Sequence, residues 1–209
     1  RDVLQIHHLQ TSIFSNLTFS KKELFGDTSP VQIIIVNEKK NKKFPKKPFE
    51  LTYNNNNFTL KSKEYNIDQK YNYNQSISLP FANIIITKNK NFDAEKAEEL
   101  SEALTVNFGT LEATVSAIQK TVKVDLADKD ATVIELSINS EQIDKASTII
   151  NGIITAYNKD AIVDKNSESQ KTKDFIDSRI SVISNELGAV ESEKERFKSA
   201  NKITDILTE

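Results

Sequence analysis

The stretch SEQIDKASTIINGIITAYNKDA, residues 140–161, decides the fold class of this chain. Its apolar residues recur with spacings of three, one and four, so they form a wide stripe along a helix that faces a core. Ser140 is a residue type that caps helix N-termini, and Glu141 follows it, so we expect the helix to begin here. The stripe consists of Ala146, Ile149, Ile150, Ile153, Ile154, Tyr157 and Ala161.

The helical pattern continues toward the C-terminus. No proline follows Pro80, so we expect either one helix of about 50–60 residues or two stacked helices. After a wholly polar stretch, residues 164–174, apolar residues recur with spacings of four and three, and Lys194 takes one position in the series. This is coiled-coil spacing. We call the apolar residues of this series the helical seam: Ile176, Ile180, Ile183, Leu187, Val190 and Phe197.

A narrow seam of this kind needs a partner, because each buried Ile or Leu gains roughly 1.5–3 kcal/mol. The pattern leaves two partners open, a segment of the same chain or a second copy of the chain. We favour the second copy, because the polar stretch 164–174 separates the seam from the residues before it. The seam is the candidate assembly site.

Upstream of residue 140 the pattern is mainly that of strands. Runs rich in β-branched residues and alternating apolar residues predict strands and hairpins at residues 31–36, 49–60, 81–87, 104–108 and 122–138. Thr110 predicts the cap of a short helix over residues 111–118, and residues 3–14 have a loosely helical pattern. We therefore predict an α+β fold. Residues 1–139 form a body with a mixed sheet and packed helices, and residues 140–209 form a long protruding helical segment continuous with it.

Composition limits the function. The 209 residues carry a net charge of −2 and include no cysteine, which excludes disulfide scaffolds, zinc fingers and thiol chemistry. The sequence has no methionine either, so we expect a processed chain or a piece of a longer one. No apolar run approaches the length of a membrane-spanning helix, and no signal peptide opens the chain.

Catalytic and metal-binding patterns are weak. The only histidines, His7 and His8, would point about 100° apart on a helix, which is unsuitable for shared metal ligation. Asp125, Asp128 and Asp130 lack the glycine and distant glutamate of a calcium loop, and we interpret them as a polar turn. Phosphate-binding glycine loops are also absent. We expect no catalytic, cofactor-binding or metal site in this fragment.

Lysines cluster in one loop. The first 90 residues carry a net charge of +7, and the remaining residues carry −9. The cluster could meet an anionic partner such as lipid head groups or an acidic polymer, or it could be a solvated loop that shields a strand edge. We favour the solvated loop and expect no nucleic-acid partner, because aromatic residues are sparse around it. This basic loop consists of Lys39, Lys40, Lys42, Lys43, Lys46 and Lys47.

The segment from Val122 to Asp205 resembles a known family. The resemblance is carried by phrases such as ATVIELSI (131–138), YNKDA (157–161), TKDFI (172–176) and NKITD (201–205). They are similar to the periplasmic domain of Wzc-type polysaccharide co-polymerases, bacterial tyrosine kinases related to the Wzz chain-length determinants. Two upstream phrases, ELFGD (23–27) and ANIII (82–86), fit the variety found in Bacteroidetes.

The resemblance implies a non-catalytic periplasmic scaffold held at the bacterial inner membrane by flanking membrane helices. Copies form a homo-oligomeric ring that regulates the chain length and export of capsular or exopolysaccharide. Its implied partners are a polysaccharide polymerase, an outer-membrane export channel and the nascent polysaccharide. The parent's cytoplasmic tyrosine kinase would use ATP and magnesium, although a kinase-less relative stays open.

The alternative to this resemblance is a soluble carbohydrate-binding or adaptor module with a coiled-coil stalk. The two interpretations differ in what surrounds the fragment in its parent protein. Two flanking hydrophobic spans would favour the co-polymerase, and their absence would favour the soluble module.

Overall fold

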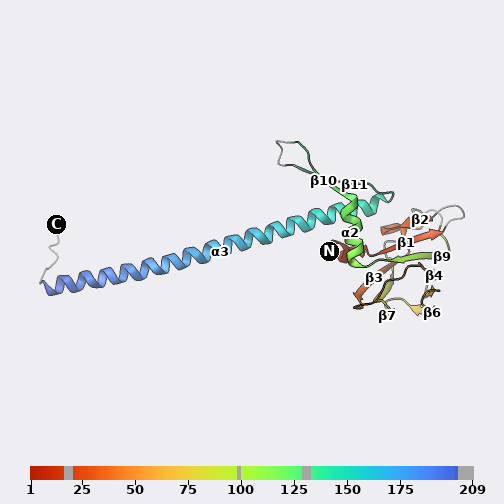
Figure 1. Cartoon of the computed structure of the whole chain (residues 1–209), viewed down its shortest axis with the longest axis horizontal. Coiled ribbons are helices and arrows are strands. Elements are labelled where there is room, and N and C mark those ends of the chain that lie inside the picture. The colour runs from red at the N-terminus through yellow and green to blue at the C-terminus, as the bar shows by residue number, and fades with distance from the viewer. Residues whose placement is uncertain (17–20, 98–99, 129–132, 202–209) are drawn as a thin grey trace. The chain divides into compact units, whose positions relative to one another are not determined.

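The chain folds into strands and helices that confirm the α+β class (Figure 1). The computed structural model describes residues 1–16, 21–97, 100–128 and 133–201. Two compact units divide the chain, Arg1–Ala156 and Tyr157–Glu209. Helix α3, Ile143–Ala200, contains 58 residues and contributes to both units, so the first unit extends past residue 139.

The described residues of the first unit form three sheets. A six-stranded sheet has the order β2-β1-β9-β4-β5-β6, with β1 (Thr11–Asn16), β2 (Lys21–Leu24), β4 (Phe49–Tyr53), β5 (Asn57–Ser62), β6 (Ile67–Asn72) and β9 (Ala103–Phe108). A three-stranded sheet has the order β3-β8-β7, with β3 (Val31–Glu38), β7 (Ser76–Ser78) and β8 (Ala82–Lys88). A separate hairpin pairs β10 (Val122–Leu126) with β11 (Ile134–Ile138).

Every strand pair within the described ranges is antiparallel, which corrects the expectation of a mixed sheet. Parallel neighbours need a crossover connection of about a dozen residues or more, whereas short turns join antiparallel neighbours. The turn between β4 and β5 shows how one such link is built. The side-chain oxygen of Asn54 accepts hydrogen bonds from the backbone N–H groups of Asn56 and Asn57, both at 2.9 Å.

The main core joins the two larger sheets. Its buried residues include Ile33 and Ile84 of the three-stranded sheet together with Leu51 and Leu104 of the six-stranded sheet. Phe81, just before β8, has no exposed surface and contacts aromatic rings around it. Its ring centroid lies 4.8 Å from Phe44, 6.0 Å from Phe49, 5.7 Å from Tyr65 and 5.3 Å from Phe108.

A second, smaller core forms around α1 (Asp2–Ile6), α2 (Leu111–Thr121) and the first turns of α3. Leu4, Leu9 and Ile149 are its buried residues. A short ion pair fixes the beginning of α3 beside the six-stranded sheet, since the Lys145 ammonium lies 2.5 Å from a carboxylate oxygen of Glu23. Both side chains are largely buried, with exposed fractions of 18% and 25%.

At Gly152, α3 lies close to Val3 of α1 and to His7, which follows α1. A Cβ atom at this position would lie 2.5 Å from Cγ1 of Val3 and 3.5 Å from the ring of His7. Val is stiff at χ1, so the clash is not relieved by a simple rotation of the side chain. Gly152 is therefore the residue that lets α1 pack on α3.

We expect Gly152→Ala to lower the stability of the first unit. Alanine gains roughly 0.5–1 kcal/mol over glycine inside a helix, but overpacking a core typically costs about 1–3 kcal/mol. The matched control is Gly188→Ala, because a Cβ there meets nothing within 4 Å. Thermal unfolding followed by circular dichroism should show a lower Tm for Gly152→Ala alone. An unchanged or higher Tm for Gly152→Ala would contradict the close packing.

Two local expectations need correction, and two strands lie where none was predicted. Residues 3–14 are not one helix, since α1 ends at Ile6, His8 takes a positive φ of 53° and β1 begins at Thr11. Ser140 does not cap α3, which begins at Ile143; its hydroxyl instead accepts a hydrogen bond from the Gln142 N–H at 3.2 Å. The structure also contains β6 and β7, which lie in a segment without a predicted element.

Candidate functional site

The helical seam lies on the part of α3 that belongs to the second unit. At about 100° per residue its members stay on one side of the helix, although a repeat of seven drifts by about 20° per heptad. A left-handed supercoil with a partner helix removes this drift. Exposed fractions of the six seam residues range from 49% at Ile176 to 62% at Phe197.

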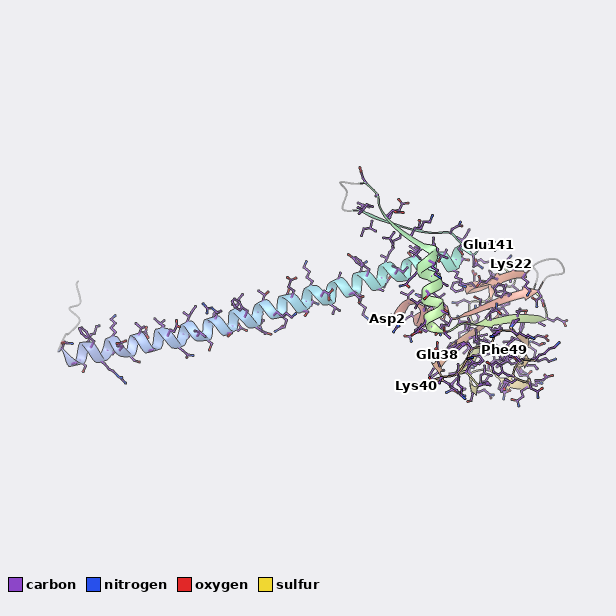
Figure 2. All side chains as sticks on the ribbon, in the orientation of Figure 1. Asp2, Lys22, Glu38, Lys40, Phe49 and Glu141 are labelled. Atoms are coloured by element: carbon purple, nitrogen blue, oxygen red, sulfur yellow. The ribbon has the colours of Figure 1, made fainter. Side chains whose placement is uncertain are left out.

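The surroundings of the seam suit a helical partner. Side chains of the segment 157–200 extend around the helix in Figure 2, and most of its residues are exposed. Lys194 occupies the seam position between Val190 and Phe197. A single lysine among apolar seam positions lowers the stability of a coiled coil but selects its register and oligomeric state. The seam can therefore specify one alignment of partner helices.

Hydrogen bonds tie part of the basic loop to other residues of the first unit. The Lys39 ammonium donates hydrogen bonds to the Ser78 hydroxyl at 2.8 Å and to the Leu79 carbonyl at 2.6 Å. Backbone N–H groups of Lys46 and Lys47 donate to one carboxylate oxygen of Glu64. The remaining side chains of the loop, at Lys40, Lys42, Lys43, Lys46 and Lys47, are exposed. Lys40 lies close to Glu38, where β3 ends (Figure 2).

The two histidines lie at the end of α1. Burial, followed by the charge of His7, lowers the pKa of His8 below its usual value. Within residues 1–16, 21–97, 100–128 and 133–201, no cluster of three or more His, Cys, Asp or Glu side chains could hold a metal ion. Asp130 of the acidic turn lies outside those ranges.

The sequence pattern did not predict a groove that lies in the first unit. It has a volume of about 950 Å³ and lies where the β4–β5 turn, the residues after β6, strand β3 and the end of β8 meet. Seven of its twelve lining residues carry side-chain amides: Gln32, Asn55, Asn56, Asn72, Asn74, Asn89 and Asn91. The only signal in the sequence is the density of asparagine between residues 54 and 91, which does not show that these residues converge.

Neither the protein-family models nor the curated proteins compared with the chain match it. The described part of the chain contains no helix with the combined length and apolarity needed to cross a bilayer.

Proposed function

We propose that the chain is a non-catalytic scaffold of a polysaccharide co-polymerase and that the helical seam packs against other copies of the chain. The observation that carries this proposal is the exposure of six regularly spaced apolar residues on α3, at 49–62% each. The resemblance over residues 122–205 supports the same family.

Packing between copies accounts for the seam better than packing within the chain. The described part of the second unit is a single helix, Tyr157 to Ala200, and Asn201. In water, a helix gains most of its stability by burying an apolar face, and an uncovered seam lacks that gain. A second copy offers an identical stripe with the same spacing, which is the usual partner in a coiled coil.

In this proposal the fragment lies in the periplasm, and its parent is anchored in the inner membrane. Copies form a ring that regulates the chain length and export of a capsular or exopolysaccharide, together with a polymerase and an outer-membrane channel. The parent carries a cytoplasmic tyrosine kinase that uses ATP and magnesium. The isolated chain associates weakly, since membrane helices and the kinase domain raise the effective concentration of the scaffold.

Thiol protection tests the seam in the full-length parent, with any cysteines outside this chain replaced. The chain has no cysteine of its own, so Leu187→Cys introduces a single reporter thiol. Asn185→Cys is the matched control, because two residues correspond to about 200° around the helix and place it on the opposite face. In membranes, a water-soluble maleimide should modify Cys at position 187 much more slowly than at position 185.

Dissociation in denaturing detergent should remove this difference. Equal reaction rates at the two positions in intact membranes would contradict an interface between copies at the seam. Slow reaction at position 187 in the isolated monomeric chain would also contradict it, because the partner would then lie within one chain.

A further inference from the structure

We infer that the amide-lined groove of the first unit binds an acidic oligosaccharide. The inference deepens the proposed function, whose scaffold works on a polysaccharide, but its site is separate from the seam, since the groove is formed entirely by residues 32–91 within Arg1–Ala156. It adds a ligand site to a region of the chain that the proposed assembly does not use.

The lining of the groove matches a ligand rich in hydroxyl groups. Each side-chain amide offers two donors and an acceptor, and a sugar hydroxyl both donates and accepts. Six of these amides make no side-chain hydrogen bond to any described residue, so they are available to a ligand. They belong to Gln32, Asn55, Asn56, Asn72, Asn74 and Asn91.

Hydrogen bonds fix the backbone of the turns that carry several of these exposed amides. The hydrogen bonds of Asn54 fix the turn that carries Asn55 and Asn56. The Tyr73 hydroxyl donates to the Asn54 carbonyl at 3.0 Å, which links that turn to the residues after β6. A site that is ordered in advance loses less entropy when it binds.

Asn89 orders the opposite wall of the groove. Its side chain is 8% exposed, and its amide donates to the carbonyls of Gly26 at 2.7 Å and Ser29 at 2.8 Å. Its side-chain oxygen accepts a hydrogen bond from the Asn91 N–H at 3.0 Å. The turn that presents Lys90 and Asn91 is therefore anchored to the body.

The charges of the groove favour an anionic sugar. Lys88 and Lys90 line it, and no aspartate or glutamate is among the lining residues. The Lys88 ammonium lies 5.5 Å from the centre of the Tyr73 ring, which holds this charge beside the amides. On a saccharide, the carboxylate of a uronate residue is the group that would pair with these lysine ammonium groups.

A nucleic acid fits the same groove less well. Single-stranded nucleic acids bind through a positive groove and a series of aromatic rings on which successive bases stack. Here Tyr73 is the one aromatic residue of the lining, and amides outnumber lysines. The observations therefore favour hydroxyl recognition over phosphate and base recognition.

The experiment is an NMR titration of the ¹⁵N-labelled chain with hexasaccharides of galacturonate, alginate and hyaluronan. Maltohexaose serves as the neutral comparison and hexathymidylate as the nucleic-acid comparison. We expect at least one acidic hexasaccharide to shift the amide signals of residues 55–56, 72–74 and 88–91. Its binding should be tighter than that of maltohexaose and should weaken with added salt.

Variants locate the binding. Asn72→Ala combined with Asn91→Ala should weaken binding about tenfold, as the loss of two net hydrogen bonds implies. Lys88→Gln combined with Lys90→Gln should remove the preference for acidic over neutral sugar, whereas exposed Asn107→Ala on β9 should change nothing. Dispersed spectra confirm that each variant folds. Absence of binding by all three acidic sugars, equal binding of maltohexaose, or equal or tighter binding of hexathymidylate would overturn the inference, whatever the thiol-protection result.

Discussion

Replacing Phe81 with alanine should lower the free energy of unfolding by about 3–5 kcal/mol, the usual range for a buried phenylalanine. Phe81 has no exposed surface, and its ring packs against Phe49 and Phe108 of the six-stranded sheet. The residue itself directly precedes β8 of the three-stranded sheet. Its removal therefore opens a cavity at the contact between two sheets.

Urea unfolding monitored by circular dichroism and tyrosine fluorescence measures this loss. Tyrosine fluorescence reports on the sheets, because four of the five tyrosines pack against the main core: Tyr53, Tyr65, Tyr71 and Tyr73. Phe175→Ala is the control, since the Phe175 side chain is 66% exposed and its loss should change stability by at most about 0.5 kcal/mol. A loss below about 1 kcal/mol for Phe81→Ala would contradict the described core.

Leu187→Asp should have the largest effect on assembly. In the single chain Leu187 is 57% exposed, so an aspartate there stays hydrated and the Tm should not change. At an interface between copies, the change removes roughly 1.5–3 kcal/mol of burial and places an unpaired charge among apolar residues. Association should therefore weaken on the order of 100-fold for each contact.

Light scattering of the detergent-extracted parent measures the assembly, and the polymer profile of cells measures its consequence. Asn185→Asp is the control, because it adds the same charge on the opposite face of the helix. The expected result is a smaller particle and an altered polymer length for Leu187→Asp only. A lower Tm of the isolated chain would place the partner within the chain, and no change in any measurement would refute a role for the seam.

Local periodicity explains which elements could be predicted. The apolar run at residues 31–36 is typical of a buried strand and lies in β3. The alternating apolar residues at 104–108 lie in β9. Thr110 precedes a helical pattern, and its hydroxyl accepts a hydrogen bond from the Ala113 N–H at 3.1 Å. After residue 140 the long helical pattern forms one helix rather than two stacked ones.

Features that depend on distant residues could not be predicted. Strand β6 directs only Ile67 and Tyr71 inward and is otherwise polar, so its pattern resembles a loop until β5 pairs with it. Strand β9 lies between β1 and β4, which precede it by many residues, and no local pattern specifies these neighbours. The groove is a further case, since its amides come from separate segments that only the finished sheets bring together.

The exposed part of α3 has a consequence for how often its helical hydrogen bonds open. Beyond Tyr157 its backbone is protected mainly by its own helical hydrogen bonds, and such helices open locally at little energetic cost. Amide hydrogens of the segment 164–200 should therefore exchange with solvent faster than those of the buried strands, and slow down when copies associate. If copies pack at the seam as proposed, helix rigidity and assembly become one coupled equilibrium.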